Sequence, residues 1–131
     1  LVAFPPDTWL AAVQIFLALA VGHAIADFPL QGEFLATCKN RHVLKKMGDP
    51  LRPPSIWLTC MLVHCVTHAG AVWLVTGSFF LGIVELGLHF LIDVAKCEGY
   101  TNFNVDQFLH MICKAAYVIV GYAGWMSCCC S

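Results

Sequence analysis

The sequence has few charged residues. Only 11% of its 131 residues are Asp, Glu, Lys or Arg, and 60% are hydrophobic, whereas about 25% of the residues in a soluble domain are charged. A soluble chain of this length cannot hide so much apolar surface from water. The composition therefore excludes an ordinary soluble domain. It predicts a single integral-membrane helical domain over residues 1–131, with the lipid bilayer as its solvent.

Two further features are missing. No run of basic residues alternates with aromatic residues, which excludes a nucleic-acid-binding surface. No basic leader precedes the first apolar segment, and that segment carries His23 and Asp27, so we do not interpret it as a signal peptide.

Cysteine is abundant, with eight residues, but its placement does not suggest a disulfide framework. Cys60, Cys65 and Cys113 lie inside apolar stretches, where we expect buried thiols that pack as small hydrophobic groups. Cysteines near a membrane are often acylated, so the terminal run Cys128–Cys130 is either a lipid attachment site or an inert tail.

Four apolar stretches approach the roughly 20 residues that a membrane-spanning helix needs. Backbone groups in lipid must be satisfied within the segment, so we expect helices and an all-α, four-transmembrane-helix bundle. The third stretch is short, which predicts tilting or extension by its flanks. The expected spans are Trp9–Ala26, Ile56–Thr76, Phe79–Ala95 and Phe108–Met126.

The long connection between the first two spans predicts one amphipathic helix on the membrane surface, over Gln31–Lys46. Phe34, Leu35, Val43 and Leu44 are the residues expected to face lipid.

Basic residues lie in two of the connecting loops, and both loops fall on the same side of the predicted bundle. The opposite side, with both termini and the hairpin after the second span, has no basic residue. The positive-inside rule then places the loops in the cytoplasm and both termini outside. The basic residues of the two loops are Lys39, Arg41, Lys45, Lys46, Arg52 and Lys96.

Each expected span carries two polar residues spaced four apart, which places them on one face of a helix. All four pairs fall at a similar depth, in the cytoplasmic half of the predicted bundle. Ionisable groups inside a membrane are costly and usually functional. The pairs are His23 with Asp27, His64 with His68, His89 with Asp93, and Asp106 with His110.

These eight side chains predict a metal centre, because three carboxylates gathered in low dielectric repel one another unless cations or protons compensate them. Eight ligands suit two divalent transition-metal ions better than one. Zinc is expected first, with iron or manganese as alternatives. The Glu-x-x-His pattern of soluble di-iron bundles is absent.

Other polar residues flank the expected centre. Glu85 and Lys114 lie one helical turn deeper, and we expect either an ion pair between them or a role in proton transfer. Gln31, Lys39 and Lys96 stand at the cytoplasmic mouth, where they would hold an anionic substrate group or contact lipid phosphates. The remaining histidine, His42, is expected to be solvated.

The order of these motifs resembles a family of small bacterial and phage membrane proteins, domain-of-unknown-function family 3307. The resemblance covers nearly the whole chain and implies a four-span membrane fold, but no activity. The motifs that carry it are His23-Ala-Ile-Ala-Asp27-Phe28-Pro-Leu-Gln31, then Lys39, His64 and His68, His89 to Asp93 with Lys96, and Asp106-Gln107 with His110.

The leading functional hypothesis is a metal-dependent hydrolase that acts on a lipid or lipid-linked phosphoryl or acyl substrate at the cytoplasmic leaflet, with Asp106 or Glu85 as general base. One alternative is a non-enzymatic metal-binding or ion-conducting membrane module. Another is a structural subunit of a membrane assembly, and a third is a di-iron membrane oxidoreductase. A homo-oligomer or a larger membrane complex also stays open.

Overall fold

The computed structural model describes residues 3–124. The terminal cysteines Cys128–Cys130 and the expected end of the fourth span at Met126 lie outside the described residues. Within the described part the chain forms helices and no strands, which confirms the all-α expectation. The helices are α1 (Trp9–Asp27), α2 (Gly32–Cys38), α3 (Arg41–Met47), α4 (Ile56–Thr76), α5 (Phe79–Cys97) and α6 (Phe103–Tyr122).

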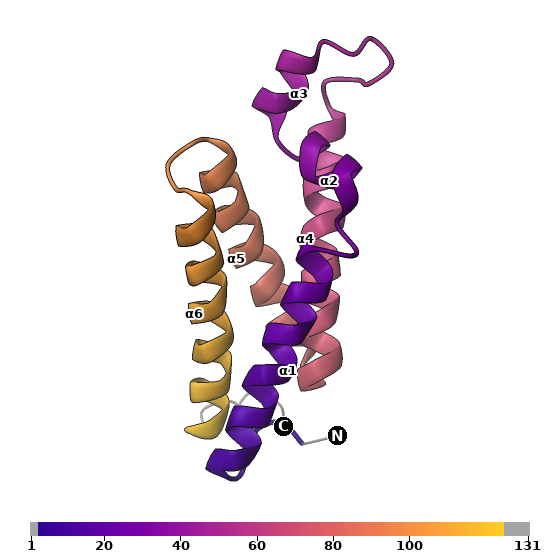
Figure 1. The fold of residues 1–131 in the computed structure, drawn as a ribbon. Coiled ribbons are helices and arrows are strands. Elements are labelled where there is room, and N and C mark those ends of the chain that lie inside the picture. The colour runs from indigo at the N-terminus through magenta and orange to yellow at the C-terminus, as the bar shows by residue number, and fades with distance from the viewer. Residues whose placement is uncertain (1–2, 125–131) are drawn as a thin grey trace.

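The four long helices form a bundle in which each packs against two others (Figure 1). Helix α1 contacts α4 and α6, and α5 contacts the same two helices from the other side. The short helices α2 and α3 lie at one end of this bundle, while α1 begins and α6 ends at the other (Figure 1). We call these the α3 end and the terminal end.

Side-chain caps fix where three of the long helices begin. Thr8, Ser78 and Asn102 each precede a helix, and each accepts a hydrogen bond from the backbone N–H three residues later. The cap at Asn102 starts α6 at Phe103, so the helix begins five residues before the expected start of the fourth span at Phe108. Apolar composition alone could not place this start, because the first turns of α6 are rich in polar residues.

The expected surface helix over Gln31–Lys46 is instead two short helices, α2 and α3. The break falls at Asn40, whose backbone is extended. Its side-chain oxygen accepts hydrogen bonds from the backbone N–H groups of His42 and Val43, at 2.9 and 3.2 Å. Asn40 thus begins a second helix at a point where the amphipathic spacing had predicted one continuous helix.

The apolar faces of α2 and α3 divide between surface and interior. Phe34 and Val43 are exposed, as expected. Leu44 is buried instead, in a small cluster that includes Cys60 of α4, and Leu35 packs against that cluster. Only part of the predicted lipid-facing surface therefore exists, because α3 folds back onto the start of α4.

By length and composition, two described helices, α1 and α4, qualify as membrane spans, and not the four that were expected. Helix α5 carries Glu85, Asp93 and Lys96, and α6 opens with a polar stretch. These polar residues lower the mean hydropathy of both helices. The mean does not record whether a side chain points into the bundle or out of it.

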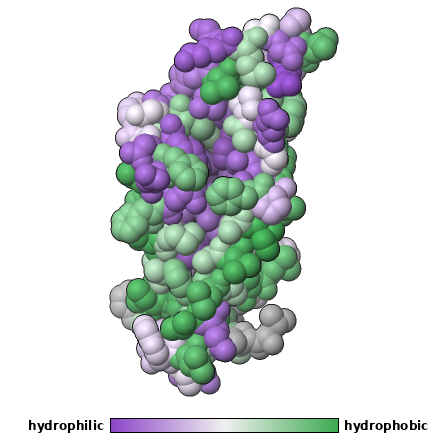
Figure 2. All heavy atoms as spheres, in the orientation of Figure 1, coloured by the Kyte–Doolittle hydropathy of each residue, from purple (hydrophilic) through white to green (hydrophobic). Residues whose placement is uncertain are grey.

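The interior differs between the two ends of the bundle. Toward the terminal end it is apolar, with Ile15, Leu19, Val72, Leu81 and Val118 in one buried cluster. Toward the α3 end it is polar. Figure 2 shows the same division on one outer face, where hydrophilic residues gather in the upper half and hydrophobic residues dominate the lower half.

Helices α4 and α5 approach each other closely at Gly82. A Cβ atom there would lie 3.1 Å from the Ala69 carbonyl oxygen and 3.2 Å from the Trp73 Cβ. Gly87 lies further along the same helix and faces open space. The backbone contact between α4 and α5 thus depends on the missing side chain at position 82.

We predict that Gly82→Leu lowers the melting temperature in detergent, because a bulky side chain would force α4 and α5 apart at a cost of about 1–3 kcal/mol. The matched variant Gly87→Leu replaces a glycine of the same helix that has no neighbour. It should melt at or above the wild type, since leucine favours helix more than glycine does. Equal losses in the two variants would contradict close packing at Gly82.

Candidate metal centre

The structure brings together all eight of the expected metal ligands, and we call them the polar cluster. They come from α1, α4, α5 and α6 and lie in the interior toward the α3 end. Asp27 has 11% of its side chain exposed, and each of the other seven is at most 3% exposed. The members are His23, Asp27, His64, His68, His89, Asp93, Asp106 and His110.

Four members form a group suited to one ion. The Nε2 atoms of His68 and His64 lie 3.1 and 3.5 Å from Asp27 Oδ1. The Nε2 atoms of His64 and His89 lie 3.1 Å apart. A tetrahedral zinc ion with bonds of about 2.0–2.1 Å separates its ligand atoms by roughly 3.3 Å. The group from Asp27, His64, His68 and His89 thus has the donor chemistry of a tetrahedral site, and three of its six distances between ligand atoms are close to those of such a site.

A second group consists of Asp93, Asp106 and His110. The His110 Nε2 atom lies 3.6 Å from Asp106 Oδ1 and 3.9 Å from Asp93 Oδ1. Both His110 Nε2 and Asp106 Oδ1 are buried without a hydrogen-bond partner in the part of the chain that the structure describes. Buried polar atoms are normally satisfied, so this unmatched pair fits a cation that would bind both.

The ring of His23 lies beside both groups, and Gln107 of α6 lies next to it. The Gln107 amide donates a hydrogen bond of 2.7 Å to Asp27 Oδ2, and its oxygen lies 3.3 Å from His23 Nε2. Sequence analysis did not place Gln107 among the site residues, although its position three residues before His110 was a usable signal. Gln107 is half-buried, so the cluster approaches the surface between α1 and α6.

Lys39 and Lys96, which were expected at the mouth, are bonded to the cluster itself. The Lys39 ammonium donates to Asp93 Oδ2 and to Gln31 Oε1, both at 2.7 Å. The Lys96 ammonium donates to Asp93 Oδ1 and Asp106 Oδ2, also at 2.7 Å. Lys39 is buried, so neither a bound substrate nor a lipid phosphate is needed to satisfy its charge.

These lysines change the charge argument made from the sequence. Asp93 and Asp106 already have cationic partners. Among the described residues, Asp27 has no lysine or arginine within ion-pair distance and contacts only imidazole rings and the Gln107 amide. The need for a compensating cation is therefore concentrated at Asp27 and not shared equally by three carboxylates.

Glu85 and Lys114 form a buried ion pair, the first of the two outcomes left open by the sequence. The other Glu85 oxygen accepts a hydrogen bond of 2.8 Å from the Tyr117 hydroxyl, a partner that sequence analysis missed. His89 Nδ1 lies 3.1 Å from Glu85. Glu85 is therefore fully engaged, and its surroundings argue against the expected role as general base.

The contact with Glu85 fixes the orientation of the His89 ring. A carboxylate beside Nδ1 favours the tautomer with its proton on that atom, which leaves the Nε2 lone pair directed at the four-ligand group. Carboxylates that orient a metal-bound histidine in this way are common around metal sites.

His42 is exposed and lies outside the polar cluster, as expected. Its Nε2 atom lies 3.2 Å from Glu98, which also accepts a hydrogen bond of 2.7 Å from Arg41. The Arg41 hydrogen bond, followed by the contact with His42, lowers the pKa of Glu98. His42 thus offers a matched control for the five buried histidines.

Residues 15–128 match the family described as protein of unknown function (DUF3307). The chain belongs to this family. The matched region includes every member of the polar cluster, together with Gln107, Lys39, Lys96 and Lys114. Comparisons with curated proteins and with solved structures gave no match.

We predict that Lys114→Met destabilises the protein by about 3–5 kcal/mol, because it leaves the Glu85 carboxylate buried without its cation. The double variant Glu85→Gln with Lys114→Met removes both charges and should recover more than half of the lost stability. Thermal melting in detergent measures both. A double variant that melts no higher than Lys114→Met would contradict an ion pair as the source of the loss.

Proposed function

We propose that this protein is an integral-membrane, metal-dependent hydrolase acting on a lipid or lipid-linked phosphoryl or acyl substrate. The observation that carries the proposal is the four-ligand group of Asp27, His64, His68 and His89, whose ligand atoms converge from three helices. Three imidazoles and one carboxylate form a donor set that binds zinc, iron or manganese.

A four-span arrangement is supported by the direction in which polar side chains point. The charged residues of α5 and α6 face the bundle interior, where Glu85, Asp93, Asp106 and Lys114 are each at most 1% exposed. The outer faces of all four long helices carry exposed apolar residues. A bilayer in contact with this bundle would therefore meet apolar side chains on every long helix. Examples are Leu17, Leu62, Leu91 and Ile119.

We place the α3 end in the cytoplasm and the terminal end outside. Lys39, Arg41, Lys45 and Lys46 belong to α3 or its immediate flank, and Arg52 follows in the next loop. The positive-inside rule favours this orientation. The polar cluster would then lie in the cytoplasmic half of the membrane.

Two divalent ions, with zinc preferred, would occupy the two groups. The first ion would bind the four-ligand group, and the second would bind between Asp106 Oδ1 and His110 Nε2. Metal ions in such sites acidify a bound water and stabilise charge on a phosphoryl or acyl group. If only the first ion binds, Asp106 Oδ1 is the unpaired carboxylate oxygen that can accept a proton from water, which is the base role expected for Asp106.

The partial exposure of two residues at the edge of the cluster, one on α1 and one on α6, supports an enzymatic role. Asp27, a member of the cluster, and Gln107, its neighbour, are both partly exposed. The Gln107 amide, which donates to Asp27, is a partly exposed hydrogen-bond donor that is suited to orient a substrate oxygen near Asp27 and its ligand group.

An ion-conducting role is less well supported. Conduction needs polar groups along the whole path, whereas the buried interior toward the terminal end is the apolar cluster around Leu19 and Val72. A purely structural metal site is the stronger competitor, because its ligands are almost fully buried and three lysines already balance most of the carboxylates.

We predict that the chain purified without chelator contains up to two transition-metal ions, measured by elemental analysis. His68→Ala should remove the ion of the four-ligand group and lower hydrolysis of short-chain phosphatidic acid or a lipid ester by at least about a hundredfold, since an absent ion loses several kcal/mol of charge stabilisation.

His42→Ala is the matched control, because it removes an exposed histidine outside the polar cluster. It should keep both metal and activity. Wild-type protein with no metal would overturn the proposal. Metal lost in His68→Ala, with no hydrolysis by the wild type, would leave the structural role in its place.

We also predict that Lys45→Cys is shielded from a membrane-impermeant thiol reagent in intact cells, and that Asp7→Cys is labelled. Both positions are exposed and lie at opposite ends of the bundle. Labelling is measured as the gain over the wild type, whose own cysteines supply the background. The reverse pattern would contradict the orientation.

A further inference from the structure

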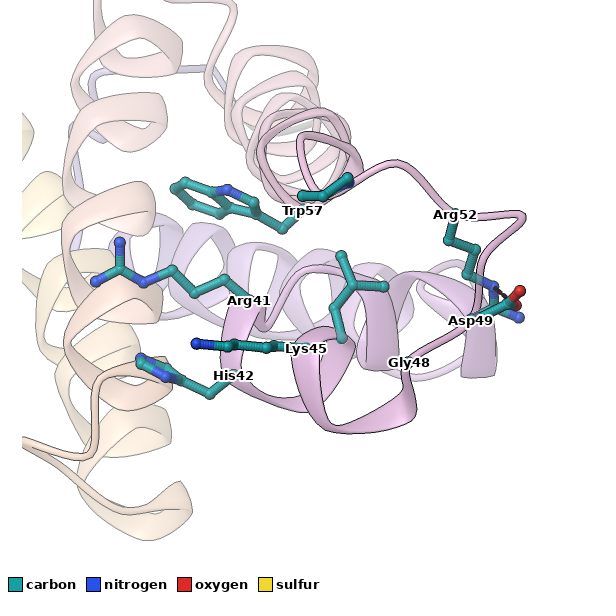
Figure 3. Close-up of a pocket in the computed structure, with 9 residues that line it drawn as sticks. Arg41, His42, Lys45, Gly48, Asp49, Arg52 and Trp57 are labelled. Atoms are coloured by element: carbon teal, nitrogen blue, oxygen red, sulfur yellow. Dashed lines mark ion pairs between the residues drawn. The ribbon is translucent and has the colours of Figure 1, made fainter.

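A pocket of about 590 Å³ lies between α3, the following loop and the start of α4. It is separate from the polar cluster and is lined in part by Arg41, His42, Lys45, Asp49, Arg52 and Trp57. Figure 3 shows Arg41, His42 and Lys45 extending side by side from α3, with Trp57 of α4 across from them. We call it the basic pocket.

The charge of the basic pocket is positive. Its walls contribute three cationic side chains and one carboxylate, that of Asp49. Asp49 pairs with Arg52 at 3.1 Å, away from the other cations (Figure 3). Arg41 and His42 both pair with Glu98, whereas Lys45 has no ion-pair or hydrogen-bond partner among residues 3–124. A free ammonium beside a guanidinium is suited to a phosphate group.

The surroundings of the basic pocket favour an amphiphile over a soluble anion. Leu44 and Pro54 give it apolar wall, and the Arg41 guanidinium lies 5.8 Å from the centre of the Trp57 ring. Met47 and Leu51 adjoin lining residues in the sequence and are exposed, Leu51 to 89%. Tryptophan beside basic and exposed apolar residues is typical of the boundary between lipid headgroups and acyl chains.

The basic pocket also lies on the way to the polar cluster. A smaller cavity of about 90 Å³ shares Arg41 and Trp57 with it and is lined as well by Lys39 and Glu98. Lys39 in turn donates to Asp93 of the cluster. A headgroup bound in the basic pocket would therefore be connected to the candidate metal ligands through the buried Lys39.

From this geometry we propose that the basic pocket binds the phosphate group of an anionic lipid, with Lys45 and Arg41 as the phosphate ligands and Trp57 against the glycerol region. The inference deepens the proposed function, and rests on it for the placement of the α3 end at the membrane surface. It names phosphate-bearing lipids as the substrate class.

The test compares Lys45→Ala with Lys46→Ala in the full chain. Both variants remove one lysine charge from α3, but only Lys45 lines the basic pocket. Native mass spectrometry in detergent measures binding of phosphatidic acid and of phosphatidylcholine. We expect Lys45→Ala to weaken phosphatidic acid binding about tenfold, the loss of one charge-assisted contact. Lys46→Ala should stay within about twofold of the wild type.

Equal losses in the two variants would overturn the proposal, because they would mean attraction to overall charge. Displacement of the lipid by an equal concentration of inorganic phosphate would keep the phosphate site but overturn a lipid as its ligand. Melting temperatures check that both variants fold. The same titration in His68→Ala separates this inference from the metal proposal, since the basic pocket contains no member of the polar cluster and should bind lipid unchanged.

Discussion

Contacts between polar side chains of different helices hold this bundle together from the inside. Asp27 of α1 contacts His68 of α4, and Glu85 of α5 pairs with Lys114 of α6. If lipid surrounds the long helices, apolar burial gives little force between them, and packing and interhelical hydrogen bonds must supply it. The side chains that make the candidate centre are then also those that bring the helices together.

The division between a polar and an apolar interior has a functional meaning under the same view. A centre that carries out chemistry on water must be reached from one side and closed on the other. The apolar cluster around Leu19 closes the terminal end, while Asp27 of α1 and Gln107 of α6 are partly exposed. The partition of residues along each helix, more than any single ligand, distinguishes the proposed reaction site from a pore.

The four polar pairs could be predicted from the sequence because a spacing of four fixes a helix face whatever the packing. The helix Ile56–Thr76 agrees with its expected bounds, since a largely apolar run between Pro53-Pro54 and Gly77 defines both of its ends. The start of α6 was missed because Asn102 acts through one capping hydrogen bond that composition does not record.

Contacts across the chain were the harder part to predict. Nothing in the local pattern shows that Lys39 reaches Asp93, 54 residues away, or that Tyr117 completes the surroundings of Glu85. Both are long-range pairings that depend on how α2 and α6 pack. The same limit explains why the carboxylates looked uncompensated in the sequence, when two of the three have lysine partners in the folded chain.

Lys39 gives the fold a further property. Lys39 lies between α2 and α3 at the α3 end, yet its ammonium is buried against Asp93 in the interior. Movement of the short helices away from the bundle would have to separate Lys39 from Asp93, so this ion pair opposes the movement. Opposite charges in a low dielectric resist such separation strongly. The ion pair of Lys39 with Asp93 thus ties the two short helices to the interior of the bundle. Any event that alters the charge on Asp93 also alters how firmly the short helices are held.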